Sequence, residues 1–446
     1  MKLNDHPTVK WYRKQNEETE NYFLQNIDAK WLKELCLEEG ASDVGLISID
    51  NPDISENEKE ELFELLPTVR SVISLAFQLN SEALKTKAHS IANLEYNLAF
   101  GQANNICRRI ARRLQRNRIR ALNTTTGFPF EADRWPKKMW LIPDKKMAER
   151  AGLGKMGWNR LVLHPQHGAS VVLGNILIDR EMTAYDAPLQ YNPCLECKLC
   201  VAACPTGAIG KEGHFNFVSC YTHNYREKLG GFLNWIEILA DSKSAEDYRR
   251  KVGDNETISM WQNLSIVSQT RCDRCVAVCP AGEENIGQFL SDRKKYKAQT
   301  VDWMQANVET VYAVRGSDAE GYVRAKYPLK YVKLVGNGLR PDSIGAFLTR
   351  LPGLFQRNQA ANLDAILHFT FTGKEPCEVS VRIKDKEIKV DQTQSGKPDL
   401  HLIADSETWL RFLAKKERLL LAVLKKKIRI KGPLKLMQAF AKCFPS

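Results

Sequence analysis

The chain lacks the sequence features of membrane-spanning proteins and of exported proteins. In its 446 residues no uninterrupted apolar run approaches the roughly 18–20 residues of a transmembrane helix. Residues 1–7 contain neither the apolar stretch of a signal peptide nor a twin arginine, so we expect a cytoplasmic protein. A hydrophobic content of 43% and a charged content of 26% are ordinary for a soluble globular protein of about two to four domains.

Seven of the twelve cysteines form two runs with the spacing of metal ligands, and Cys220 lies between the runs. The first run, from Cys194 to Pro205, reads C-x2-C-x2-C-x3-C-P, the spacing of bacterial two-cluster ferredoxins. The second, from Cys272 to Pro280, lacks its first cysteine, which Cys220 can supply. Zinc sites favour two C-x2-C pairs, and disulfides require an exported chain. We therefore predict two 4Fe–4S clusters, one held by Cys194, Cys197, Cys200 and Cys279, the other by Cys204, Cys220, Cys272 and Cys275.

The other cysteines and the excess of positive charge carry less information. We expect buried free thiols at the remaining cysteines, which are Cys36, Cys107, Cys377 and Cys443.

The formal charge of +12 is concentrated in residues 108–120, with seven arginines, and in residues 415–431. Both segments are typical of the solvated face of an amphipathic helix. The alternative is attraction to a polyanion, either nucleic acid or an anionic membrane.

Residues 1–184 are predicted to form an α/β domain. Apolar periodicity indicates four helices, over residues 31–39, 58–66, 89–118 and 146–151. Strands are expected at 43–49, 69–76, 119–122, 161–163 and 171–178. The strand at 69–76 is almost continuously apolar, which is typical of a sheet covered on both faces.

A glycine-rich loop follows the last of these helices. Gly152, Gly154 and Gly157 match G-x-G-x-x-G, but the loop leaves a helix and enters a strand. A dinucleotide-binding fingerprint requires the opposite order. We therefore do not expect NAD binding.

The same region resembles a known superfamily. Residues 151–159, a turn containing Gly168, residues 173–179 and the nearby cysteines are together similar to the cobalamin-dependent iron–sulfur reductases. This superfamily contains epoxyqueuosine reductase and the respiratory reductive dehalogenases, and the resemblance covers about residues 85–290. The segment around Cys220 is similar to the one that supplies the isolated cluster cysteine in epoxyqueuosine reductase. The resemblance implies a base-off corrinoid lined by Gly152, Leu153, Gly154, Gly157, Trp158 and Asn159.

The chain departs from this superfamily at the positions of its acids. The catalytic aspartate of epoxyqueuosine reductases is replaced by Lys137 or Lys138, although Asp133 and Asp144 are not far away. The arginine that dehalogenases carry after the turn glycine is replaced by Ala169. The proton donor is therefore unassigned. Tyr96 is a candidate, with packing of its helix as the alternative.

Two further histidines and the middle of the chain complete this part of the sequence. His164 and His167 are expected to be turn residues rather than cobalt ligands.

Residues 185–290 are predicted to form a ferredoxin module with an inserted helix at 232–240. Residues 291–334 read as a connecting segment without a motif, and residues 326–333 as solvated surface.

Residues 335–446 are predicted to form an α+β domain. Strands are expected at 363–372, 377–384, 387–390, 400–404 and 428–431, with helices starting at Asp405 and spanning 434–444. The order of its segments resembles a sterol-carrier-protein domain, on residues 370–373, 398–403, Trp409 and 430–434. The resemblance implies an apolar tunnel for a lipid-like molecule. The alternative is a filled domain that only docks or dimerises.

Together these patterns predict a corrinoid-dependent iron–sulfur reductase acting on an apolar small molecule. Its partners would be a low-potential donor of the ferredoxin or flavodoxin type, the apolar substrate and, through its basic surface, a membrane. The first alternative is an electron-transfer protein without corrinoid. The second is a tRNA-modifying reductase, which the missing aspartate and the different C-terminal domain disfavour, so nucleic acid is the less expected partner.

Overall fold

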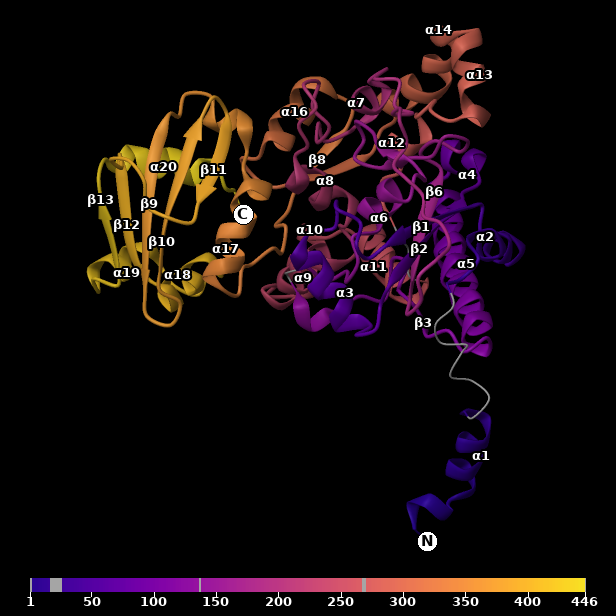
Figure 1. Ribbon diagram of the computed structural model, residues 1–446. Helices are drawn as coiled ribbons and strands as arrows, with labels where there is room; N and C mark the ends of the chain where they lie inside the picture. Colours follow the sequence, from indigo (N-terminus) through magenta and orange to yellow (C-terminus); the bar gives the residue numbers. More distant parts are fainter. Residues whose placement is uncertain (1, 17–25, 136–137, 267–269, 446) are drawn as a thin grey trace.

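The computed structural model describes residues 2–16, 26–135, 138–266 and 270–445. Figure 1 shows a C-terminal sheet with its helices lying beside the rest of the molecule. The remainder consists of an N-terminal part built on a sheet and a mainly helical middle part. Among the described residues, no helix is long and apolar enough to cross a membrane.

The N-terminal part is built on a four-stranded antiparallel sheet in the order β1-β2-β6-β3. Every residue of β2 except Gln78 is buried, which confirms the prediction of a sheet covered on both faces. The strands are β1 (Asp43–Ser48), β2 (Ser71–Gln78), β3 (Ala121–Asn123), β4 (Lys155–Met156), β5 (Val162–Leu163) and β6 (Val171–Ile178). The helices are α1 (Pro7–Asn16), α2 (Ala29–Glu38), α3 (Glu56–Leu65), α4 (Ser81–Lys85), α5 (His89–Arg116) and α6 (Asp144–Arg150).

The long helix α5 packs one apolar stripe against the core and turns its arginines outward. Arg109 Nε lies 2.8 Å from a carboxylate oxygen of Glu39, and Arg113 lies 3.1 Å from the other oxygen. Part of the basic segment at 108–120 is therefore occupied by ion pairs within the protein.

Two glycines hold residues 152–168 between the sheet and the cysteine runs. A Cβ added to Gly45 in β1 would lie 2.2 Å from the carbonyl oxygen of Ala151, so the end of α6 contacts the sheet directly. Gly168 has φ +59°, and an added Cβ would lie 1.8 Å from the carbonyl oxygen of Ala281. Only glycine permits such approaches. The second contact joins the turn at 164–168 to the end of the second cysteine run.

The middle part consists of short helices around the cysteines. They are α7 (Leu199–Ala203), α8 (Phe217–Asn224), α9 (Leu229–Ala240), α10 (Ala245–Lys251), α11 (Asp254–Ile266), α12 (Arg274–Ala277) and α13 (Glu283–Ser291). They are followed by α14 (Arg293–Lys297), α15 (Trp303–Ala306), β7 (Thr310–Ala313), α16 (Asp318–Lys326) and β8 (Tyr331–Leu334). The predicted inserted helix is α9.

The segment 291–334 contains helices and a pair of strands, although its sequence indicates only a connection. β7 pairs with β8 in parallel. The prediction of solvated surface is wrong at Lys330, whose side chain is buried. Its Nζ donates to the carbonyl oxygens of Met304 and Asn307 and pairs with Glu309, each at 2.8 Å. A lysine can be buried in this way because all three of its donors find oxygen atoms.

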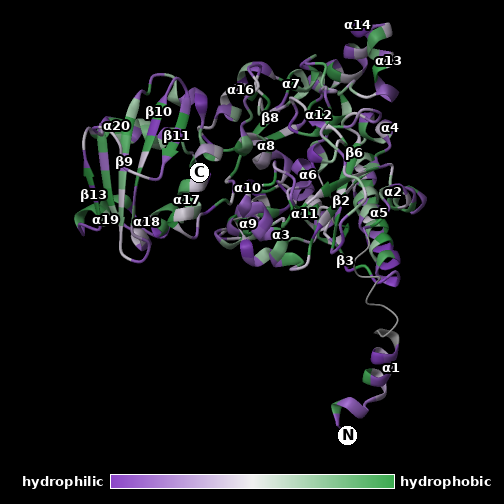
Figure 2. Ribbon diagram, in the orientation of Figure 1, coloured by the Kyte–Doolittle hydropathy of each residue, from purple (hydrophilic) through white to green (hydrophobic). Residues whose placement is uncertain are grey.

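The C-terminal part has a five-stranded sheet in the order β11-β10-β9-β12-β13, in which only the β9–β12 pair is parallel. Apolar residues recur along its strands (Figure 2). Its interior contains aromatic rings whose centroids lie between 5.7 and 6.3 Å apart, from Phe347, Phe369, Phe371, Trp409 and Phe440. The strands are β9 (Ala365–Thr372), β10 (Cys377–Lys384), β11 (Glu387–Asp391), β12 (Leu400–Asp405) and β13 (Ile428–Lys431). The helices are α17 (Ile344–Leu354), α18 (Ser406–Leu413), α19 (Leu419–Leu424) and α20 (Leu434–Lys442). The α+β arrangement agrees with the prediction.

The four cysteines outside the runs are free thiols. Cys36, Cys107 and Cys443 are buried, as expected. Cys377 differs, because it is partly exposed at the start of β10.

Candidate functional site

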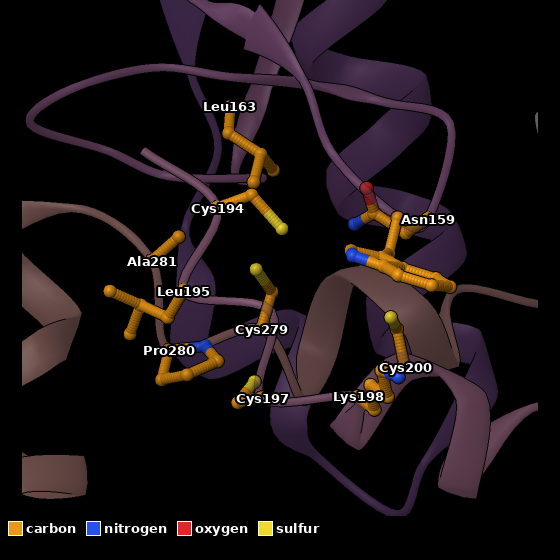
Figure 3. A pocket seen from close by; sticks show the side chains of 11 residues that line it. Asn159, Leu163, Cys194, Leu195, Cys197, Lys198, Cys200, Cys279, Pro280 and Ala281 are labelled. Carbon is orange, nitrogen blue, oxygen red and sulfur yellow. The ribbon is translucent and has the colours of Figure 1, made fainter. Parts of the chain in front are cut away.

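Four cysteines from two distant segments surround one hollow. Cys194, Cys197 and Cys200 come from the first run, and Cys279 comes from the second. They line a hollow of about 330 Å³, part of which is open to solvent. Figure 3 shows their sulfur atoms gathered around this space. We call these residues the first cysteine group.

The other four cysteines form a second group. Burial raises the pKa of the Cys275 thiol, and the nearby Cys272, Cys220 and Cys204 raise it further. Cys204 also raises the pKa of Cys220. These mutual effects bring together the four residues of the second predicted ligand set, which come from the end of α7, from α8 and from the start of α12.

The chemistry of both groups fits iron–sulfur clusters. Burial raises the pKa of Cys200, Cys220 and Cys279 to about 12, so these thiols stay protonated at neutral pH unless a cation binds them. Iron supplies that charge, and thiolate is the ligand that iron–sulfur clusters take. In the part of the chain that the structure describes, no three His, Cys, Asp or Glu side chains are spaced to hold one metal ion. A multinuclear cluster sets its thiolates farther apart than a single ion does. The assignment of each cysteine to a cluster stays a prediction.

The three glycines of the loop at 152–157 pack against the protein itself. A Cβ added to Gly152 would lie 2.6 Å from the carbonyl oxygen of Ala187. A Cβ added to Gly154 would lie 2.4 Å from the carbonyl oxygen of Leu163, and one added to Gly157 would lie 2.6 Å from the Leu163 side chain. Close packing of the chain already requires glycine at these positions. That they line a corrinoid stays a prediction.

The end of this loop lies between the two cysteine groups. Trp158 and Asn159 line the hollow of the first group, and Lys198 Nζ lies 4.7 Å from the centre of the Trp158 ring. Asn159 Nδ2 donates to the carbonyl oxygen of Cys275 at 3.2 Å, so this residue contacts both groups. Leu153 is instead part of the apolar core.

A set of polar side chains from α5, α6 and β6 lies beside the second cysteine group. Burial raises the pKa of the Tyr96 hydroxyl well above its usual value, and Asp273, Cys275 and Cys272 add to this effect. Burial lowers the pKa of Lys145, while Cys275 and Cys220 oppose that change. Tyr96 and Lys145 are therefore both close enough to Cys275 to interact with its charge, although Lys145 is exposed and its Nζ donates to the carbonyl oxygen of Arg160 at 2.7 Å. We call this set the inner polar cluster; it consists of His89, Asn93, Tyr96, Asp144, Lys145 and Asn175.

Asp144 is the acid of this cluster. Burial raises the pKa of its carboxyl to about 7, although Asn175 Nδ2 donates to its Oδ1 at 2.7 Å and lowers it. The other positions considered from the sequence lie elsewhere: Asp133 is exposed, Lys138 pairs with Glu61, and Lys137 lies outside the described residues. The sequence names Asp144 and Asp133 as acids near the expected position but does not choose between them, because an acid in the first turn of a helix is commonly a matter of helix stability.

Three buried polar atoms in this region have no hydrogen-bond partner among the described residues. They are Asn93 Oδ1, Thr126 Oγ1 and Asn175 Oδ1. Leaving such an atom unsatisfied costs about 1–3 kcal/mol, so we expect a bound group or an ordered water to satisfy each of them. Cobalamin carries amide groups around its ring that can donate to these oxygens. The residues present therefore fit the corrinoid that the resemblance implies.

The two histidines of the turn are occupied by protein partners. His164 Nε2 lies 2.9 Å from Asp43 Oδ2, and His167 Nδ1 lies 3.0 Å from Glu284 Oε2. Their rings stack with centroids 4.9 Å apart. These contacts agree with the expected role of both residues in holding the turn.

Comparison with known proteins identifies two parts of the chain. Residues 348–445 match the model of the SCP-2 sterol transfer family. The epoxyqueuosine reductase of Staphylococcus aureus is 30% identical over 142 residues, which are 31% of this chain and 30% of that protein. The enzyme of Listeria monocytogenes is 32% identical over 139 residues, 31% of this chain and 29% of that protein. About a third of the chain is therefore similar to part of the epoxyqueuosine reductases, and its C-terminal part matches the SCP-2 family model.

This relationship confirms the resemblance and makes the chain a homologue of oxidoreductases. It spans about 30% of the length of the curated relatives that it matches. The solved epoxyqueuosine reductase of Streptococcus thermophilus is 17% identical and covers 61% of this chain and 74% of its own, with a TM-score of 0.33. At this TM-score the structural likeness supports no further inference.

Replacing Cys220 tests the composition of the second cysteine group. In Cys220→Ala we expect the iron content of the anaerobically purified protein to fall from about eight to about four atoms per chain, because one cluster loses a ligand. Iron analysis and electron paramagnetic resonance measure this change. Cys377→Ala, at a partly exposed thiol outside both groups, is the control and should keep all the iron. Retention of eight irons in Cys220→Ala would refute the ligand role of Cys220.

The pKa of Asp144 predicts a dependence of stability on pH. The folded state holds this proton up to about pH 7, whereas an unfolded chain releases it near pH 4. Stability is therefore lost as pH rises from about 4 to 7 and stays lost above that range. Asp144→Asn should avoid the loss and gain on the order of 1–3 kcal/mol relative to the parent between pH 5 and 8.

Thermal unfolding of both proteins across this pH range measures the difference. Asp133→Asn, at an exposed aspartate, is the matched control and should follow the parent at every pH. A constant difference between Asp144→Asn and the parent from pH 5 to 8 would contradict the assignment.

Proposed function

We propose that the protein is a reductase that passes single electrons through two 4Fe–4S clusters to a bound cobalamin and there reduces an apolar small molecule. The observation that carries this proposal is the position of the inner polar cluster. Tyr96 and Lys145 are close enough to Cys275 to interact with its charge, and Asp144 precedes Lys145 in α6, so a hydroxyl, an amine and an acid lie near a group of thiols suited to carry electrons. The kinship with epoxyqueuosine reductases supports the same reading.

Each residue of the site has a definite task in this proposal. When bound, cobalamin would supply low-valent cobalt, a strong nucleophile and reductant. Asn93, Thr126 and Asn175 would bind its polar edge through their unsatisfied oxygens. Asp144 would hold the proton that the reduced substrate takes up, because a pKa near 7 lets it release and regain a proton at neutral pH. Tyr96, whose pKa lies far higher, would keep its proton and orient the substrate.

Electrons would arrive through the first cysteine group. Its hollow is partly open to solvent, and Leu195 beside it is 43% exposed. A low-potential donor of the ferredoxin or flavodoxin type would dock at this side. The second group, closer to Tyr96, would be the last carrier before the substrate.

The SCP-2 domain would deliver an apolar substrate or hold the enzyme at a membrane. On α19, Leu420 and Leu424 are 79% and 77% exposed, and they are followed directly by Lys425, Lys426 and Lys427. Exposed leucines next to lysines are typical of segments that contact anionic membranes. Against delivery stands the interior of the domain, which aromatic rings occupy.

Two other functions are less well supported. A pure electron carrier has no use for an inner polar cluster with a buried acid. A tRNA-modifying reductase would need a basic surface, and Glu39 already pairs with Arg109 and Arg113 of the arginine-rich helix. The SCP-2 domain also gives no reason to expect a nucleic-acid substrate.

Cofactor content after anaerobic expression with cobalamin tests the proposal. We expect about eight iron atoms and one cobalt atom per chain, with a corrinoid absorption spectrum. The double variant Asn93→Leu with Asn175→Leu should bind cobalamin at least tenfold more weakly and keep its iron, because it loses two acceptors. Asn255→Leu, at an exposed asparagine of α11, is the control. Full iron content without cobalt under every loading condition would contradict the proposal and favour the electron carrier.

A further inference from the structure

A second hollow lies against the segment that follows β3. Its cavity volume is about 440 Å³, within the size range of small-molecule pockets, and it is partly open to solvent. One wall comes from residues 128–135, and the other from α9, α11 and the turn before α9. Most of the lining is apolar, from Phe128, Phe130, Trp135, Phe232, Leu233 and Leu264. We call it the aromatic pocket.

The inner wall of the aromatic pocket is attached to α5, the helix that carries His89, Asn93 and Tyr96. Phe128 follows Thr126 by two residues, and Thr126 Oγ1 is one of the unsatisfied buried atoms. Thr126 N donates to Asn104 Oδ1 of α5 at 2.8 Å, and Trp140 Nε1 donates to the carbonyl oxygen of Gly127 at 2.7 Å. This wall is therefore fixed to the helix that carries Tyr96.

Apolar residues remain exposed where the pocket meets solvent. Leu264 is 59% exposed and Leu233 is 40% exposed, on two different helices. Single exposed apolar residues are ordinary, but a concave group of leucine and aromatic side chains is typical of a binding site. The lining fits a molecule with an apolar body that contains rings.

One cation lies within this apolar lining. Lys228 is 8% exposed, and its Nζ lies 5.4 Å from the ring centre of Phe128 and 5.8 Å from that of Tyr225. The neighbouring carboxylate of Glu227 forms an ion pair with Arg271. Burial lowers the pKa of Lys228 to about 7, so an anion beside it would favour the charged form.

Three cationic side chains lie near His89, and two of them, Arg271 and Arg274, form ion pairs with Glu227 and Glu309. The pKa of His89 is lowered to about 4, first by burial and then by the positive charges of Arg271, Arg274 and Lys228. His89 belongs to the inner polar cluster, and its Nε2 accepts a hydrogen bond from Asn93 Nδ2 at 2.9 Å.

From these observations we infer that the aromatic pocket binds the substrate, and that the substrate is an apolar ring-bearing molecule with one anionic group that contacts Lys228. That the bound molecule is a substrate rests on the proposed function. The binding of such a molecule does not depend on cobalamin and can be tested without turnover.

Two fluorescent probes of matched shape test the inference on the full chain. Anilinonaphthalene sulfonate has an aromatic body and one negative charge, and N-phenyl-1-naphthylamine has the same rings without the charge. Lys228→Met should weaken binding of the sulfonate about tenfold and that of the neutral probe less than twofold. Leu264→Ser, at the exposed rim, should weaken both probes about threefold or more, because apolar contact is lost.

Two variants serve as controls. Lys243→Met replaces an exposed lysine, and Leu290→Ser replaces a leucine on α13 that is 58% exposed, like Leu264. Neither should change the affinity for either probe. Equal loss of both probes in Lys228→Met would refute the recognition of an anion. Unchanged binding in both Lys228→Met and Leu264→Ser would place the probes elsewhere, such as the SCP-2 domain, and overturn the inference.

These outcomes are separate from those of the cobalamin experiment. A protein that binds no cobalt but shows the expected probe pattern would retain the aromatic pocket and lose the proposed reaction. A protein that binds cobalt but shows no effect of Lys228→Met would retain the reaction and lose this substrate class.

Discussion

Buried thiols are stable as thiolates only beside positive charge, and the middle of this protein places eight cysteines in two groups. Burial raises the pKa of Cys200, Cys220 and Cys279 to about 12, so the apolar packing around them works against their ionisation. Iron would supply the missing charge, and metal binding of this kind is coupled to folding. The short helices α7, α8 and α12 each carry one of these cysteines, Cys200, Cys220 and Cys275 respectively. Their arrangement is therefore expected to depend on the clusters.

The two cysteine groups, the inner polar cluster and the aromatic pocket have different surroundings. The first cysteine group opens partly to solvent, the second faces Tyr96 and Lys145, and the aromatic pocket lies beyond the segment containing Thr126. Asn159 connects the two cysteine groups through the carbonyl oxygen of Cys275. Such a sequence of electron carriers, polar groups and apolar pocket suits the reduction of an oily molecule away from bulk water.

Sequence alone predicted much of the fold, because its strongest signals are local. The cysteine spacing, the continuous apolar strand at 69–76 and the α+β pattern of the C-terminal part all depend on residues close together in the chain. The inner polar cluster could not be predicted in this way. Asp144, Asn93 and Asn175 come from three elements that meet only in the folded chain, and none has a characteristic spacing. Lys330 was misjudged for the same reason, since its oxygen partners lie more than twenty residues away.

The glycines at 152–157 show how one pattern can serve two purposes. The resemblance assigns them to a corrinoid. Close contacts with Ala187 and Leu163, however, already leave no room for a side chain at these positions. The orphaned oxygens of Asn93 and Asn175 are therefore the more informative features of the region, because packing within the described chain does not explain them.

Anomalous diffraction at the cobalt absorption edge, from crystals of the protein loaded with cobalamin without oxygen, can decide where the cofactor binds. A cobalt peak between α5 and the second cysteine group, next to Tyr96 and Asp144, is the predicted result, with iron at both cysteine groups. A cobalt peak in the SCP-2 domain, or full iron sites with no cobalt beside Tyr96, would contradict it.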